Sequence, residues 1–107
     1  MFVKNENTKS QNAGNGVTRK ILGRGGSLMM VEVKFDKNAI GDPHTHPHEQ
    51  VSYIASGSFE FTLEGEKQIL KKGDSVYIPA NAIHETVALE DDSIILDVFT
   101  PQREDFL

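Results

Sequence analysis

Cysteine and tryptophan are absent from this chain of 107 residues. Without cysteine the protein has neither disulfide bonds nor thiolate ligands, so nitrogen and oxygen atoms must hold any metal ion. No apolar run is long enough to span a membrane, and the polar segment from Met1 to Gly16 shows no secretory signal. We therefore expect a cytoplasmic protein that does not bind membranes.

A cluster of basic residues is also missing. The 16 Asp and Glu residues outnumber the 11 Lys and Arg residues, which gives a net charge of −5. This balance argues against nucleic acid as a partner, and an anionic substrate would need a local positive site. The length corresponds to one domain, and because small domains gain stability by association we expect a homodimer.

No segment shows a sustained apolar periodicity of 3.6 residues, so we expect almost no helix. Apolar and polar residues instead alternate in short segments, with turn signals roughly every 8 to 12 residues. This pattern predicts an all-β sandwich or barrel. The expected strands are residues 17–21, 29–35, 51–55, 58–64, 67–71, 75–79, 84–89 and 93–100.

Three segments are expected to lie outside these strands. Residues 1–16 lack periodicity and form a loosely held N-terminal arm; an alternative is that Phe2 and Val3 dock as a terminal strand. The glycines from Gly23 to Gly26 interrupt the first strand, and residues 36–43 form a turn-rich link.

Two histidines stand two residues apart ahead of a predicted strand. On extended backbone His44 and His46 project from the same face, and Gln50 shares their parity while Glu49 points away. Imidazoles brought together in this way suit a borderline divalent transition metal. His48 lies in the same stretch, where a surface position or a hydrogen bond to a ligand is favoured over metal binding.

A second segment, residues 73–84, supplies the remaining histidine of the chain. His84 follows a turn that contains Pro79 and begins a predicted strand, so it offers a fourth ligand. A histidine-rich loop by itself can be merely solvated. The second segment, with its spaced glycine, proline and histidine, favours a metal site over that alternative.

The last predicted strand, residues 93–100, is apolar on both faces and should be covered on both sides. Asp97 lies within it, and a buried carboxylate needs a partner or a chemical role. Two interpretations are open: a structural aspartate bonded to backbone or water, and an acid or base inside the metal cavity. Arg103 follows shortly after. A C-terminal arginine is usually solvated, but its short reach back to the barrel also allows it to clamp a substrate.

The two histidine segments read His-x-His-x3-Gln-x6-Gly and Gly-x5-Pro-x4-His, and they resemble the two signature motifs of the cupin superfamily. This resemblance, over residues 41–84, implies an all-β, single-domain cupin, a jelly-roll β-barrel. We place the barrel at residues 17–100 and a C-terminal tail that packs at its mouth at residues 101–107. One departure from the motif is Asn81, which replaces a frequent glycine but removes no ligand.

Further matches run over nearly the whole chain and resemble the KdgF family of bacterial pectin degradation proteins. They lie at residues 15–22, 29–33, 44–50, 96–99 and 101–106. The resemblance implies one divalent transition metal ion (Ni, Zn, Mn or Fe) and a small-molecule uronate substrate. The implied metal ligands are His44, His46, Gln50 and His84, and the implied substrate-handling residues are Asp97, Phe99 and Arg103. It also implies an enzyme that linearises 4,5-unsaturated uronates, for example those released from pectin, to 4-deoxy-5-keto uronates.

The residue types suit that chemistry. Three imidazoles and an amide are neutral, so the full charge of the ion remains for Lewis acid action. Asp97 can shuttle the proton that C4 requires, and Arg103 can hold a carboxylate through two hydrogen bonds. Phe99 shares a face with Asp97 and either packs on the sugar ring or belongs to the core.

Two other functions remain open at this point. A cupin dioxygenase would depend on O₂ and bind an aromatic or thiol substrate, but Asp97 and Arg103 are explained better by an anionic sugar. A non-catalytic module that senses a sugar acid or carries metal would need a partner protein, because the chain shows no DNA-binding helix and no second domain.

Overall fold

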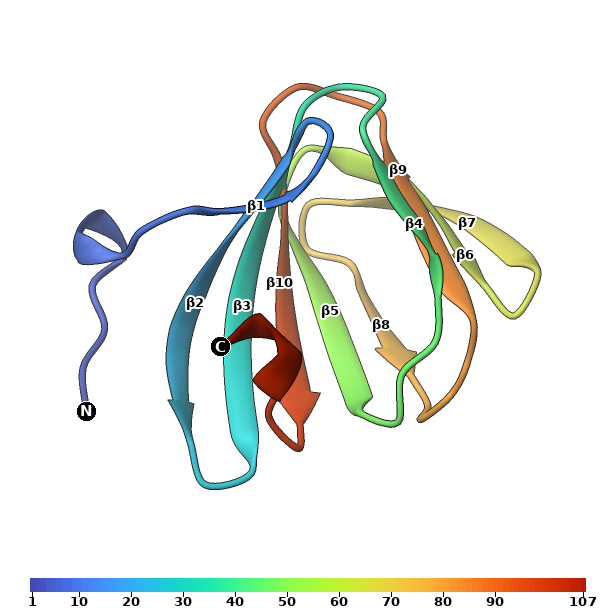
Figure 1. The fold of residues 1–107 in the computed structure, drawn as a ribbon. Coiled ribbons are helices and arrows are strands. Elements are labelled where there is room, and N and C mark those ends of the chain that lie inside the picture. The colour runs from blue at the N-terminus through green and yellow to red at the C-terminus, as the bar shows by residue number, and fades with distance from the viewer.

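Two antiparallel β-sheets pack face to face and form a jelly-roll barrel (Figure 1). The computed structural model describes residues 1–107. The larger sheet contains, in spatial order, β1 (Gln11–Gly14), β2 (Val17–Gly25), β3 (Leu28–Phe35), β10 (Ser93–Thr100), β5 (Glu49–Ser56) and β8 (Ser75–Ile78). The smaller sheet contains β4 (Ile40–His44), β9 (His84–Ala88), β6 (Ser58–Leu63) and β7 (Glu66–Lys71).

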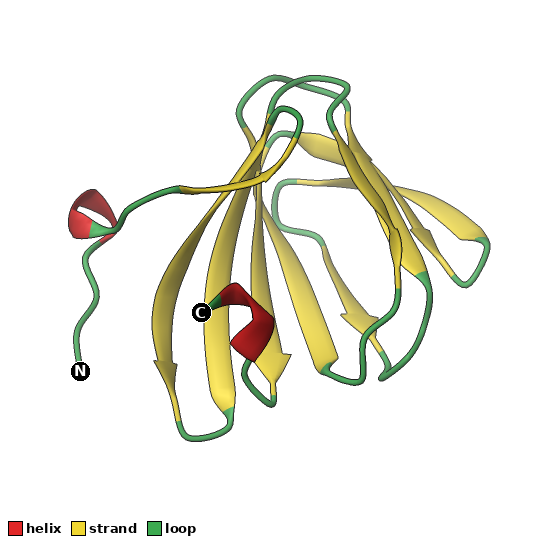
Figure 2. Cartoon of the chain, viewed as in Figure 1, coloured by secondary structure: helices red, strands yellow, loops and turns green.

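Helical structure is limited to two short 3₁₀ turns, η1 (Asn5–Asn7) and η2 (Glu104–Phe106) (Figure 2). Neither turn is long or apolar enough to span a lipid bilayer. The prediction of an all-β fold with almost no helix is confirmed.

The apolar core consists of three clusters, and two of them reach the histidines through Phe99 and Phe61. Its main cluster is built from inward-facing positions of both sheets: Val17, Phe35, Ile54, Phe59, Ala88 and Ile95. The rings of Phe35 and Phe59 meet edge to face with centroids 5.1 Å apart. Each strand places alternate residues inside, so β10 directs Ile95, Asp97 and Phe99 inward in sequence. The inward face of β10 therefore leads from the core toward the histidines.

Strand β5 directs mostly polar side chains into the barrel and apolar ones to its outer face. Gln50, Ser52 and Ile54 are buried, whereas Val51 and Tyr53 are exposed on the outer face of the sheet. The polar residues of this strand thus line the barrel interior, which agrees with the parity predicted for Gln50.

Two segments that were predicted to lie outside the strands belong to strands. Strand β2 continues through Gly23 to Gly25, because its pairing with β3 needs only backbone groups; the register shifts between Ile21 and Arg24. The predicted link at residues 36–43 contains most of β4, which pairs with β9. Its proline is tolerated because β4 is an edge strand with one unpaired side.

The N-terminal arm also takes part in the fold. Residues 11–14 pair with β2 as β1, so the terminal strand is not formed by Phe2 and Val3, which are exposed. At the other end of the chain, η2 folds back and packs Phe106 against Phe99, with ring centroids 5.9 Å apart.

Candidate active site

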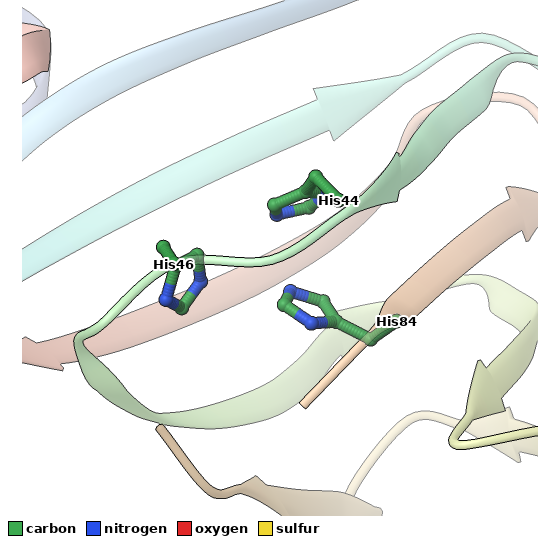
Figure 3. A group of neighbouring side chains, drawn as sticks. All are labelled: His44, His46 and His84. Carbon is green, nitrogen blue, oxygen red and sulfur yellow. The ribbon is translucent and has the colours of Figure 1, made fainter. Parts of the chain in front are cut away.

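Three histidine rings point toward one another at one end of the barrel (Figure 3). His44 ends β4, His46 lies in the following loop, and His84 begins β9 directly opposite His44 in the sheet register. One ligand atom from each ring lies within 4.8 Å of the other two. The two sequence segments predicted to share a metal therefore meet. The backbone N–H of Asn81 links them by donating to the carbonyl of His46 over 2.8 Å.

The left-handed backbone of Asn81 explains the departure from the usual motif glycine. Its φ is 65°, in the region that glycine adopts most readily and that asparagine tolerates better than most residues. The substitution keeps the turn that carries the chain toward His84.

Backbone carbonyls fix the orientation of all three rings. The Nδ1 atoms of His44, His46 and His84 lie 2.8, 3.1 and 2.9 Å from the carbonyl oxygens of Asp42, His48 and Ala82. A neutral imidazole that donates from Nδ1 presents an unprotonated lone pair at Nε2. The Nε2 of His84 is buried and has no hydrogen-bond partner, as expected of an atom reserved for a ligand.

Burial keeps two of the rings neutral. Desolvation lowers the pKa of His84 to about 4, although its hydrogen bond to Ala82 opposes this shift. Desolvation also lowers the pKa of His46, and the charge of Arg103 acts in the same direction. Neutral imidazole is the form that binds metal.

Gln50 joins the histidine cluster to a carboxylate. Its Nε2 donates to Ser52 and to Asp97, each over 2.9 Å, which fixes the orientation of the amide. Its Oε1 lies 2.9 Å from the Nε2 of His46. The Nδ1 of His46 faces a carbonyl oxygen, so a neutral ring carries its proton on Nδ1 and its lone pair on Nε2. That lone pair and the amide oxygen of Gln50 then face the same point.

The spacing of His46 and Gln50 suits a shared divalent transition ion. Two nitrogen or oxygen ligands at right angles, each about 2.1 Å from one ion, are about 3 Å apart, close to the separation of His46 and Gln50. Three imidazoles and one amide oxygen are also a donor set that such ions accept. The prediction that His44, His46 and His84 come together is confirmed; that they and Gln50 bind the ion stays a proposal.

A cavity of about 310 Å³ opens beside the cluster, a volume within the range of small-molecule sites. Its lining includes polar and aromatic side chains: Arg19, His44, Gln50, Ser52, Phe61, His84, Asp97, Phe99, Arg103 and Phe106. All three residues predicted to handle a substrate are therefore brought to one cavity with His44 and His84.

Asp97 is connected to the histidine cluster through Gln50, which contacts both His46 and Asp97. Its Oδ1 accepts hydrogen bonds from the Ser52 hydroxyl over 2.6 Å and from Gln50 over 2.9 Å. Burial raises the pKa of Asp97, although these two hydrogen bonds and the nearby charge of Arg103 oppose the shift. Asp97 is therefore hydrogen-bonded within the barrel, as a structural aspartate would be, and it also faces the cavity, as an acid or base would.

Arg103 is held at the cavity by the C-terminal tail, and its side chain is 12% exposed. Its Nε and Nη2 donate to Asp105 over 3.0 and 2.8 Å. The guanidinium also lies 4.2 Å from the ring centroid of Phe106 and 5.1 Å from that of Phe99. Phe99 is a core residue as well as a cavity residue, because it also packs with Met29 and Val31.

His48 hydrogen-bonds outside the three-histidine cluster, and its Nδ1, like the Nε2 of His84, is buried without a hydrogen-bond partner; that it is no metal ligand stays a prediction. Its Nε2 lies 3.2 Å from the carbonyl oxygen of Gln102, the residue before Arg103. His48 thus ties the histidine loop to the tail.

Sequence reasoning missed Ser52 and Arg19. Both share the inward parity of their strands, with Ser52 between Gln50 and Ile54 and Arg19 two residues after Val17. The available signal is a polar or charged residue at an inward position of its strand, the same kind of signal that identifies Gln50 and Asp97.

The facing sheets and the histidine cluster define a cupin. Residues 31–99 match the cupin domain family, and the chain belongs to it. Within the cupins, the chain belongs to the KdgF family, as the sequence predicted. It is 48% identical over 107 residues to the pectin degradation protein KdgF of Dickeya dadantii (strain 3937), covering 99% of this chain and 96% of that protein.

Solved structures agree with this assignment. The structure of KdgF from Halomonas sp. matches with a TM-score of 0.96 and 44% identity, covering 100% of this chain and 98% of that one. An RmlC-like cupin from Shewanella frigidimarina NCIMB 400 matches with a TM-score of 0.93 and 39% identity over 99% and 95% of the two chains. The polyketide cyclase RemF from Streptomyces resistomycificus, 21% identical with a TM-score of 0.82, shares the fold.

Proposed function

We propose that this protein is a metal-dependent isomerase that linearises 4,5-unsaturated uronates to 4-deoxy-5-keto uronates. The observation that carries the proposal is the side chain of Gln50, which contacts the histidine cluster at one end and Asp97 at the other. A metal site and a proton-transfer group are thereby coupled inside one cavity. The family relationship to a protein named for pectin degradation supports a uronate as substrate.

The reaction rearranges atoms without adding any. The ring of an unsaturated uronate opens when the anomeric hydroxyl loses its proton and the bond between C1 and the ring oxygen breaks, which leaves an aldehyde at C1 and an enolate at C5. The enolate becomes a ketone when C4 gains a proton. One proton lost and one gained make the product an isomer of the substrate.

His44, His46, Gln50 and His84 would hold the metal, which when bound supplies Lewis acid stabilisation of the negative charge that develops on the sugar oxygens. Asp97 accepts or delivers the protons, and its hydrogen bonds to Ser52 and Gln50 hold its carboxylate in place. Arg103 adds positive charge near the substrate carboxylate, and Phe99 forms an apolar wall for the sugar ring.

The experiment is turnover of unsaturated galacturonate by metal-loaded protein, followed by the loss of alkene absorbance. Samples without protein and with metal-stripped protein are the controls, and each reaction is run with and without O₂. The proposal expects metal-dependent, O₂-independent loss of the alkene. O₂ dependence would indicate a dioxygenase, and loss at the protein-free rate would indicate a binding module; either result contradicts the proposal.

A further inference from the structure

Arg19 is a cation in the cavity wall that the proposed mechanism does not use. It lies on β2 at an inward position, it is half-buried, and it lines the same cavity as Asp97 and His84. Its neighbour on the strand, Lys20, does not line the cavity and bonds Asn5 instead. Arg19 therefore contributes positive charge to the site of a chain whose net charge is −5.

The hydrogen-bond donors of Arg19 are mostly free. Its Nε donates to the side-chain oxygen of Gln11 over 3.0 Å, and neither terminal nitrogen has a hydrogen bond or a carboxylate within 4.0 Å. Arg103 differs, because Asp105 occupies two of its nitrogens. Of the two cavity arginines, Arg19 thus keeps more of the donors that pair with a carboxylate.

Both guanidinium groups stack on one aromatic ring. Arg19 lies 3.9 Å and Arg103 4.2 Å from the centroid of Phe106. Burial lowers the pKa of Arg19, and the charge of Arg103 acts in the same direction, while the carboxylate of Asp105, which bonds Arg103, opposes the shift. Two like charges held on one ring at the edge of a cavity form a site that an anion stabilises.

We infer that Arg19 is a substrate-binding residue that holds the carboxylate of a sugar acid in the cavity, with Arg103 as the second cation. The pair of arginines selects a uronate over the neutral sugar, and Phe106 contacts both guanidinium groups. The inference deepens the proposed function and rests on it for the identity of the sugar acid.

The first test measures binding without catalysis. Calorimetry compares saturated D-galacturonate with its methyl ester, which lacks the negative charge, on wild type, Arg19→Gln and Lys20→Gln. We expect Arg19→Gln to weaken galacturonate binding roughly 10- to 100-fold, the effect of one charge-assisted hydrogen-bonded pair. Lys20→Gln removes a charge from the same strand outside the cavity and should bind like wild type. The ester should bind wild type and Arg19→Gln equally.

The ester separates substrate binding from a structural role. If Arg19 only supports the tail through Phe106, Arg19→Gln weakens the acid and the ester by the same factor, and the inference is wrong. Arg19→Lys keeps the charge but loses the two-pronged donor geometry, so its affinity for galacturonate should lie between those of wild type and Arg19→Gln. Wild type that does not bind galacturonate, or Arg19→Gln that binds it equally well, would also overturn the inference.

Turnover of unsaturated galacturonate by the same samples separates the two proposals. Charge-selective binding through Arg19 without turnover would contradict the proposed isomerase and leave this inference standing. Normal turnover with an unchanged KM in Arg19→Gln would do the reverse.

Discussion

Gln50 donates a hydrogen bond from its Nε2 to Oδ1 of Asp97 over 2.9 Å, while its Oε1 faces the Nε2 of His46. The two residues are 47 positions apart in the chain and meet because β5 pairs with β10. An amide serves both contacts, since it offers an acceptor at one end and a donor at the other. A carboxylate at position 50 would keep the oxygen that faces His46 but would lose the donor to Asp97.

Gln50→Glu should therefore retain the metal but lower turnover. The new carboxylate partly neutralises the ion and faces Asp97 without a proton to donate, so one of the two acids is forced to stay protonated. We expect a loss of roughly 10²-fold, comparable with removal of one preorganised donor. Metal content and rate are measured on the same sample, with Gln68→Glu on the exposed strand β7 as the control. Turnover equal to wild type would refute the argument.

His84→Ala should abolish metal binding. Its Nε2 is buried and unpaired, and the remaining protein ligands would leave the ion under-coordinated. Elemental analysis of protein purified without an affinity tag should find about one ion per wild-type chain and almost none in the variant. His48→Gln is the control and should keep its metal, because His48 bonds the tail. Equal metal in wild type and His84→Ala would remove His84 from the site.

Arg103→Lys should act mainly on substrate binding. Lysine keeps the charge but loses the two bonds to Asp105 and the planar stack on Phe106, so the charge is no longer held at the cavity. We expect KM to rise roughly 10-fold with a smaller change in kcat. Lys67→Arg, the reverse exchange at an exposed position of β7 that does not line the cavity, should leave KM unchanged. An unaltered KM for Arg103→Lys would assign Arg103 to the tail alone.

Gly57→Ala should destabilise the barrel. Gly57 has a φ of +72°, and a Cβ there would lie 2.0 Å from Oγ of Ser93. Backbone strain and the clash together should cost about 2 to 4 kcal/mol and lower the melting temperature by at least about 8 °C. Gly65→Ala is a matched control, because its φ is +81° but nothing lies within 4 Å of the added atom. Equal melting temperatures for the two variants would show that the contact with Ser93 is not limiting.

The histidine site could be predicted because its information is local. His44, His46 and Gln50 share a parity within one short stretch, and His84 ends the second motif. The fold class followed from the alternation of short strands. Gly57 also occupies a motif position, and the close approach of Ser93 gives the physical reason for a glycine there.

Contacts that depend on the pairing and register of distant strands could not be predicted from the sequence. The contact of Asp97 with Ser52 requires the pairing of β10 with β5, which no local pattern specifies. The placement of Arg19 beside Phe106 requires the tail to fold back over β2. The strand through Gly23 was missed because glycine propensity was given more weight than backbone pairing with β3.

Turnover by Asp97→Asn distinguishes a proton-transfer role of Asp97 from a structural one. Asparagine preserves the shape but cannot titrate, so turnover of unsaturated galacturonate should fall by roughly 10² to 10⁴. Metal content and the melting temperature should change little, because an amide is easier to bury than a charge. Near-normal turnover in Asp97→Asn, with an altered melting temperature, would remove Asp97 from the reaction and make it a structural residue of the barrel.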